Sequence, residues 1–246
     1  MTARMRTIFL LALLCLPSGP MEGQGTSTDD AREFIGWLLQ DDRELKGIPF
    51  PEVVLAVSGK KVIPLSTNRV DDRELLARIG RGLDEVLRRM NAADNAIHKQ
   101  KRINEVSSHF EDELKRVFAK IPGFSCDYPK TAAGKVQRPG YPDLRLVDQQ
   151  GGRVVYLDPK LYEAGGRDST FRTFYFEPKK ETNKILDDGH HLIVGFEHVG
   201  RIGGGWRFTR WDLVDLSKFK VRLKAEFQGG NRDLYRPETV VGSSGR

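Results

Sequence analysis

Residues 141–160, with the sequence YPDLRLVDQQGGRVVYLDPK, decide the fold of this chain. Two runs of alternating apolar residues flank a turn that contains glycine, which is the pattern of a β-hairpin. A turn centred on Gln150 and Gly151 places Asp143 directly opposite Asp158 on the neighbouring strand. The Cβ atoms of such a pair lie about 5 Å apart. The hairpin therefore predicts two carboxylates side by side on one face of a sheet.

Lys160 lies two residues after Asp158 and shares its face, because side chains alternate along a strand. The opposite face is apolar and is predicted to face the core; it carries Leu144, Leu146, Val155 and Leu157. Two opposed carboxylates repel each other unless a cation lies between them, and carboxylate oxygens suit Mg²⁺ or Mn²⁺. A lysine beside such a metal can orient water and stabilise developing negative charge. A plain salt bridge between Lys160 and either aspartate on a solvated face is the alternative interpretation.

Pro142-Asp143 followed by Asp158-x-Lys160 resembles the PD-(D/E)XK nuclease superfamily, which includes many restriction endonucleases and junction resolvases. Its members have a helix, a three-stranded meander that carries the motif, a second helix and a further strand. The resemblance covers residues 103–199. It implies an α/β, restriction-endonuclease-like core, Mg²⁺ (or Mn²⁺) held by Asp143 and Asp158, and hydrolysis of DNA to products with a 5′-phosphate. Pro159 removes a backbone donor and indicates an edge or bulged strand.

The helix that precedes the hairpin is predicted from Ile103 to Lys120. Its apolar residues fall within about 40° of Phe110 when each residue turns the helix by about 100°. Glu111 and Glu113 both border this buried stripe. The superfamily often has a metal-binding glutamate in the pattern Phe-Glu-x-x-Leu, and the matching FEDEL sequence favours Glu111 as the third metal ligand. A solvated carboxylate on the helix flank is the alternative.

The rest of the chain divides into a mostly helical N-terminal elaboration, residues 26–102, and the nuclease-like domain, residues 103–246. We prefer one domain with an elaboration, because no flexible linker separates the two parts. In the first part, the patterns predict helices over 29–46 and 68–90, the latter capped by Asn68, and a hairpin of 53–57 with 61–65. In the second, they predict a short helix over 178–189 and strands over 124–128, 170–176, 191–197, 206–210 and 220–228.

Basic residues are the candidates for contact with a nucleic-acid backbone. The outer face of the strand predicted over 220–228 carries Lys220, Arg222 and Lys224, a stripe that can follow phosphates. A solubilising outer face is the alternative. Arg172 and Lys184 follow the second motif strand and are candidates to hold a substrate phosphate.

Residues 1–25 have the features of an export signal: two arginines, an apolar run and small residues at a cleavage position. A signal of this kind implies a secreted or periplasmic protein, and without it we expect a cytoplasmic one. The apolar run is shorter than the roughly 20 residues that span a bilayer, so no membrane span is predicted. Only two cysteines occur, which excludes a disulfide scaffold and a cysteine-based zinc site.

The chain has 246 residues, of which 39% are hydrophobic, so it can bury a core and is not a disordered chain. Its formal net charge is +6. The leading interpretation is a metal-dependent endonuclease acting on DNA, with RNA as the alternative substrate and a homodimer as a candidate assembly. A non-catalytic nucleic-acid-binding module with the nuclease fold and an exported structural or interaction protein are the rival interpretations.

Overall fold

The computed structural model describes residues 28–40, 45–170, 173–224, 226 and 228–243. The chain divides into two units, residues 1–42 and 43–246, which are described separately. The described part of the first unit is helix α1 (Thr28–Gln40), on which the rings of Phe34 and Trp37 stack 6.0 Å apart. This helix is shorter than predicted, because Lys46 lies in a turn.

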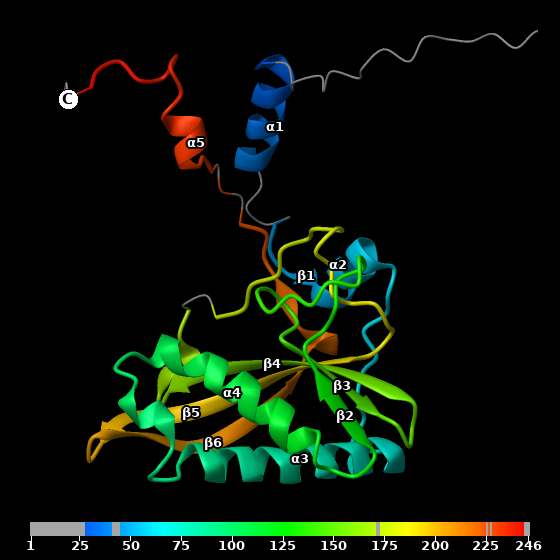
Figure 1. Cartoon of the computed structure of the whole chain (residues 1–246). Helices are drawn as coiled ribbons and strands as arrows, with labels where there is room; N and C mark the ends of the chain where they lie inside the picture. The colour runs from blue at the N-terminus through cyan, green and yellow to red at the C-terminus, as the bar shows by residue number, and fades with distance from the viewer. Residues whose placement is uncertain (1–27, 41–44, 171–172, 225, 227, 244–246) are drawn as a thin grey trace, which may run out of the picture. The chain divides into compact units, whose positions relative to one another are not determined.

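The second unit is built on a five-stranded mixed sheet (Figure 1). Its strands are, in spatial order, β2 (Phe124–Asp127), β3 (Leu144–Asp148), β4 (Arg153–Glu163), β5 (His190–Ile202) and β6 (Gly205–Asp215). Neighbouring strands are antiparallel except for β4 and β5, which are parallel. The predicted meander of three strands is therefore present, and the further strand that follows it is parallel to β4.

The register of the β3–β4 hairpin is the predicted one. Leu144 pairs with Leu157, which brings Asp143, the residue before β3, level with Asp158. β3 ends its pairing there, whereas β4 continues to Glu163 with β5 as its partner. The second half of β4, including Pro159, is thus an edge on the β3 side, the kind of position in which a sheet tolerates proline.

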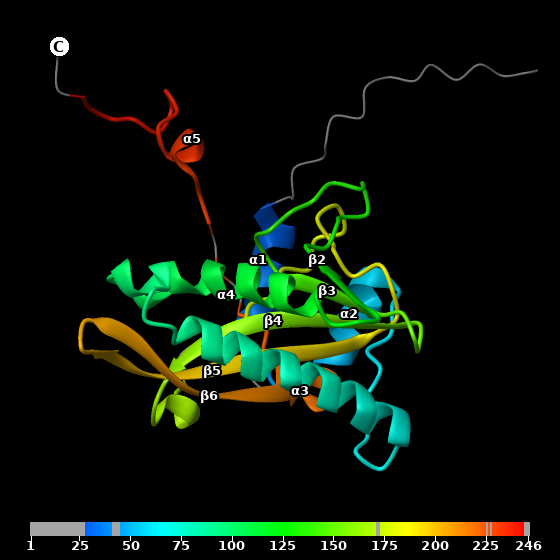
Figure 2. The same cartoon turned by 60° about the horizontal axis from the view of Figure 1, so that its bottom comes forward.

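Helices α3 (Val70–Met90) and α4 (Ile103–Phe118) pack side by side on one face of this sheet (Figure 2). Gly82 allows their close approach, because a Cβ there would lie 2.4 Å from the Phe118 ring. The Phe110 ring lies 4.4 Å from that of Phe196 on β5. The main core forms between these helices and the predicted apolar face of the hairpin, all of whose side chains are fully buried: Leu144, Leu146, Val155 and Leu157. α3, part of the predicted elaboration, therefore belongs to the same core as the sheet.

A second apolar cluster lies on the opposite face of the sheet, at the end where β3 begins. Tyr156 points away from the main core and packs with Tyr141, Ile185 and Phe50 of helix α2 (Phe50–Ser58). The remaining short elements are β1 (Ile48–Pro49) paired with β7 (Lys220–Val221), α5 (Asn231–Leu234) and the 3-10 helices η1 (Ala96–Lys99), η2 (Gly166–Asp168) and η3 (Leu216–Lys218). No helix among the described residues is long and apolar enough to cross a membrane.

The hairpin predicted over 53–57 and 61–65 is wrong, because residues 50–58 form α2. Its run of β-branched residues suggested a strand. Instead, a proline in the first turn and Gly59 in the left-handed conformation (φ 68°) begin and end a helix. Phe50 and Val54, four residues apart, are the side chains that this helix buries. The next helix, α3, begins at Val70 with Arg69 as its N-cap, so Asn68 does not cap it.

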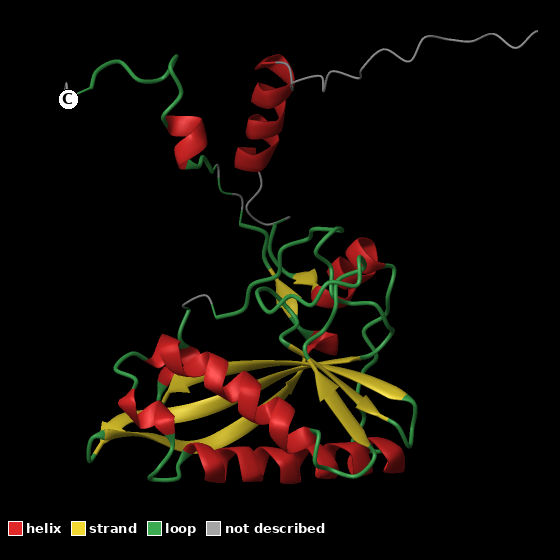
Figure 3. Cartoon of the chain, viewed as in Figure 1, coloured by secondary structure: helices red, strands yellow, loops and turns green. Residues whose placement is uncertain are grey.

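The segment between β4 and β5 also differs from the prediction. In the described part of residues 164–189, the structure has only η2 and otherwise loops (Figure 3), so the strand over 170–176 and the helix over 178–189 are not present there. The second helix that the sequence resemblance implies between these strands is therefore not present in the described part of the segment. The apolar residues of this segment, among them Phe174, Phe176 and Ile185, contact the second cluster one at a time rather than along one helical face.

Candidate active site

Asp143 and Asp158 meet where β3 begins and where β4 continues beyond it with β5 as its partner. Asp158 is 2% exposed, and Lys160 Nζ lies 2.5 Å from its Oδ2 atom. This buried oxygen accepts no hydrogen bond of regular geometry from the described residues, so the lysine contact is its ion pair. The structure thus brings the three motif residues together on one face, opposite the main core.

The carboxylate of Asp158 lies close enough to Asp143 to make ionisation of Asp143 unfavourable. Burial first, and then the neighbouring Asp158 carboxylate, raise the pKa of Asp143 to about 8, and Lys160 opposes this shift. Without a further cation, the pair therefore holds a proton near neutral pH. A site of this kind gains electrostatic stability from a bound cation.

The structure distinguishes the two glutamates of α4. The Glu111 side chain is 17% exposed and pairs with Arg138 at 2.9 Å, and its charge helps to raise the pKa of Asp143. Glu111 therefore lies on the side of the aspartates. Glu113 is buried and ion-paired to Arg89 at 3.5 Å and Arg116 at 2.8 Å.

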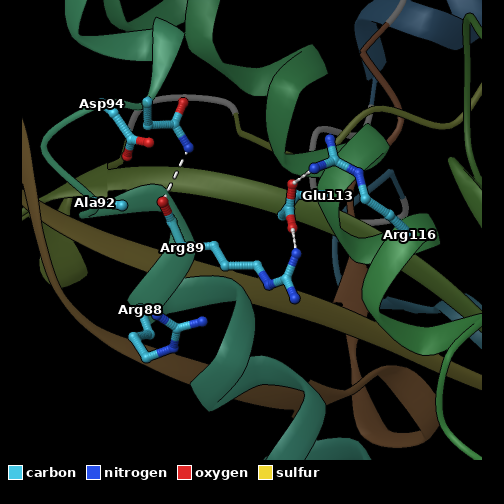
Figure 4. A pocket seen from close by; sticks show the side chains of 7 residues that line it. Arg88, Arg89, Ala92, Asp94, Glu113 and Arg116 are labelled. Atoms are coloured by element: carbon cyan, nitrogen blue, oxygen red, sulfur yellow. Dashed lines mark hydrogen bonds and ion pairs between the residues drawn. The ribbon is translucent and has the colours of Figure 1, made fainter.

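Figure 4 shows Glu113 between these two arginines, at a hollow of about 450 Å³ near the C-terminal end of α3. The lining residues are Arg88, Arg89, Ala92, Asp94, Asn95, Glu113 and Arg116. None of the predicted site residues lines this hollow, and its buried carboxylate is already paired with arginines. It is therefore a different place from the aspartate pair.

Lys184 does not have the predicted role of a phosphate contact. It is 1% exposed, and its ammonium donates to the carbonyl oxygens of Gln137 and Arg138, both at 3.2 Å, and of Gly140 at 2.5 Å. With its donors used inside the protein, it has no surface to present to DNA. Arg172, the other candidate in this segment, lies outside the described residues.

The basic stripe predicted over 220–228 is also wrong as a feature of one strand. β7 contains only Lys220 and Val221, and the residues that follow have no regular strand where they are described. Lys220, Arg222 and Lys224 are exposed, but Leu223, which would lie on the inner face of such a strand, is also 50% exposed. No alternation between an inner and an outer face organises these three cations.

A polar cluster that the sequence reasoning missed lies beyond Lys160 on the same face. Tyr162 leans over Gly195, where a Cβ would be 3.2 Å from its ring, and donates a hydrogen bond to Asp212 at 2.5 Å. Asp212 is ion-paired with Arg210 at 2.7 Å and with Arg167. Strand alternation alone places Tyr162 beside Lys160, but only the order of β4, β5 and β6 brings Asp212 to the same row.

The donor atoms fit a hard divalent cation. Two carboxylates lie close together, one of their oxygens is buried without a regular hydrogen bond, and a third carboxylate is close enough to help raise the pKa of Asp143. In the part of the chain that the structure describes, however, no three His, Cys, Asp or Glu side chains already converge as a metal-binding group. Lys160 and Arg138 pair with two of the carboxylates instead.

The fold and the site are those of an α/β protein with a mixed sheet. Two carboxylates and a lysine lie together on this sheet, beside the start of β3. The model of the Type II restriction enzyme MjaV family matches residues 43–238, and the chain belongs to this family of restriction endonucleases. A protein of Methanocaldococcus jannaschii described as "Type II restriction enzyme MjaV" is 32% identical over 219 residues, which cover 85% of this chain and 94% of that protein. The expected relationship to restriction endonucleases is thereby confirmed at the level of the family.

Proposed function

We propose that this chain is a divalent-metal-dependent endonuclease of the PD-(D/E)XK type that hydrolyses phosphodiester bonds of DNA. The observation that carries the proposal is the Asp143–Asp158 pair with Lys160. These residues lie where β4 extends beyond the start of β3. Family membership supports it, because Type II restriction enzymes cut DNA and generally need divalent metal ions.

Asp143, Asp158 and Glu111 would hold Mg²⁺ or Mn²⁺. The bound ion would supply a water of lowered pKa and stabilise charge on the phosphate. Lys160, at 2.5 Å from Asp158, is placed to orient the attacking water or to donate to a phosphate oxygen. Arg138 pairs with the Oε2 atom of Glu111, so Oε1 is the oxygen that would bind the metal while this ion pair remains.

Incubation of plasmid and linear DNA with Mg²⁺, with Mn²⁺ and with EDTA tests the function. We expect cleavage with either ion and none with EDTA, and matched RNA is expected to remain intact. A salt-dependent shift of DNA in the presence of Mg²⁺ without any cleavage would favour the non-catalytic binding module instead.

Two further proposals concern assembly and location. A homodimer would present one site to each strand of a duplex, so we propose this assembly, to be tested by light scattering of the purified protein. Residues 1–25 lie outside both the described residues and the matched range. Export through these residues is a proposal, and N-terminal sequencing of the mature protein tests it.

The two glutamates of α4 give a matched pair of variants. Glu111→Gln is expected to reduce cleavage on the order of 100-fold and to weaken Mn²⁺ binding, because a ligand charge is lost. Glu113→Gln is expected to leave Mn²⁺ affinity unchanged but to destabilise the protein by about 1–3 kcal/mol, because Arg89 and Arg116 lose a buried partner. Cleavage assays, Mn²⁺ titration and urea denaturation measure these effects. If Glu113→Gln weakens Mn²⁺ binding and Glu111→Gln does not, Glu113 is the metal ligand instead.

Arg167 and Arg210 are proposed to contact the DNA backbone beside the cleavage site. Both side chains are about half exposed, and Asp212 holds one edge of each guanidinium while leaving other donors free. Replacing both by Gln is expected to lower the slope of log affinity against log salt by about 0.9 for each lost phosphate contact. DNA binding is measured with protein that also carries Asp158→Asn, which is expected to prevent cleavage.

Two controls accompany this measurement. Arg81→Gln removes an exposed arginine from α3, on the other side of the sheet, and is expected to leave the salt slope unchanged. Replacing Lys220, Arg222 and Lys224 together by Gln tests the alternative path. If this triple variant lowers the slope and the Arg167 and Arg210 variant does not, DNA runs over residues 220–224.

A further inference from the structure

A buried lysine joins the loop before β3 to the segment before β5. The Lys184 ammonium has three donors, and its three hydrogen-bond acceptors are the carbonyl oxygens of Gln137, Arg138 and Gly140. Burial of an ammonium is unfavourable unless hydrogen bonds and opposite charges compensate it. One short loop, residues 137–140, provides all of the hydrogen bonds.

The opposite charges come from the candidate metal site. Burial lowers the pKa of Lys184, whereas Asp143, Asp158 and Glu111 each raise it. The ammonium is therefore within electrostatic reach of all three proposed metal ligands. It lies on the protein side of them, because Lys184 is 1% exposed.

The loop that Lys184 holds leads to two of these ligands. Along the chain, residues 137–140 continue into Pro142 and Asp143. Across space, Arg138 of this loop pairs with Glu111 on α4 at 2.9 Å and lies over the Tyr128 ring, 4.5 Å from its centroid. Lys184 thus links the segment before β5, the chain entering β3 and, through Arg138, helix α4.

We propose that Lys184 is a positioning residue, which holds the 137–140 loop so that Asp143 and Glu111 stand close enough to share one divalent cation. This inference rests on the proposed function. It assigns Lys184 no contact with DNA or with the reacting atoms. Its three hydrogen bonds hold a loop that contains no helix or strand and that leads into the first aspartate.

Charge and position have opposite effects on metal affinity, which makes the proposal testable. The positive charge of Lys184 repels a metal ion, so a residue that acted only by its charge would weaken metal binding. Its removal would then tighten Mn²⁺ binding. If Lys184 positions the ligands, its removal weakens Mn²⁺ binding although one repulsive charge is gone.

The experiment compares wild-type protein with Lys184→Met, which keeps the length of the side chain but not its donors. Mn²⁺ affinity is measured by calorimetry without DNA, and loop anchoring is measured as the rate of tryptic cleavage after Lys135. We expect at least a tenfold loss of Mn²⁺ affinity and at least a tenfold faster cleavage. Lys179→Met is the matched control, because Lys179 lies in the same segment, is 57% exposed and is expected to change neither value.

Unchanged or tighter Mn²⁺ binding in Lys184→Met, with the tryptic rate of the wild type, would overturn the proposal. If this variant does not fold, as shown by circular dichroism, Lys184→Gln replaces it, because an amide still donates two hydrogen bonds; we expect at least a threefold loss of affinity, and none would again overturn it. Neither measurement depends on cleavage. Wild-type protein that binds Mn²⁺ but does not cut DNA would therefore refute the proposed function and leave the positioning role standing.

Discussion

Asp143→Asn is expected to reduce Mg²⁺-dependent DNA cleavage on the order of 1,000-fold while it makes the metal-free protein more stable. The loss follows from removing a ligand charge where the proposed metal binds. Asp158→Asn is expected to have the same effect on cleavage, because the two carboxylates face each other across the hairpin. Plasmid cleavage in Mg²⁺ measures this, and turnover near that of the wild type in either variant would refute the metal site.

The gain in stability depends on pH in a defined direction. An aspartate in an unfolded chain has a pKa of about 3.9, whereas burial and Asp158 raise that of Asp143 to about 8. A raised pKa in the folded state contributes stability below about pH 4, and this contribution is lost as the pH rises through about 8. The free energy of unfolding of the metal-free wild type should therefore fall between these values, and Asp143→Asn should remove this dependence.

Urea denaturation in EDTA at pH 5 and pH 8 measures the difference. Because Asp143 is only half buried, we expect a gain of about 1–3 kcal/mol at pH 8, well below the value for full burial. Asp148→Asn is the matched control from the same hairpin. Asp148 is 1% exposed and paired with Arg78 and Arg153, which lower its pKa, so its replacement should destabilise the protein at both pH values. Equal pH slopes in wild type and Asp143→Asn would contradict the raised pKa.

The hairpin and α4 were within reach of the sequence because their determinants are local. A short turn of residues 149–152 and strict alternation set the pairing of Leu144 with Leu157, and the helical repeat around Phe110 identified the buried side of α4. The same reasoning failed over 50–58. Its apolar run is too short to distinguish strand from helix by period, and the flanking proline and Gly59 decide the outcome.

The positions of the remaining candidate residues depend on contacts between distant segments. The choice between Glu111 and Glu113 depends on which flank of α4 faces the aspartates. The helical repeat of α4 identifies its buried side but does not distinguish its two flanks. Lys184 looked like a surface cation because its acceptors are carbonyl oxygens more than 40 residues away along the chain. Asp212 reaches the row of Lys160 only through two further strands. Strand order and loop contacts are tertiary properties, so patterns of residue type did not reveal them.

Lys160→Ala is expected to lose cleavage on the order of 100-fold but to retain Mn²⁺ binding, or to tighten it. The Lys160 ammonium is no metal ligand, and at 2.5 Å from Asp158 Oδ2 it occupies the oxygen that the cation would need. A bound cation would take the place of Lys160 at this oxygen, and the lysine would then be placed to orient water or to stabilise charge on the phosphate. Its removal deletes that second role and also relieves the competition for Asp158.

The metal-free protein is expected to be less stable when it carries the same substitution. Asp158 is 2% exposed, and without Lys160 its carboxylate loses its ion-pair partner, so Lys160→Ala is expected to lower the free energy of unfolding by about 1–3 kcal/mol in EDTA. Saturating Mn²⁺ should restore most of this loss, because the cation replaces the missing positive charge. Lys160→Arg, which keeps the charge, should retain the stability in EDTA but not full turnover. If Lys160→Ala instead abolishes Mn²⁺ binding, the lysine acts by holding Asp158 in place, and its role in the reaction is indirect.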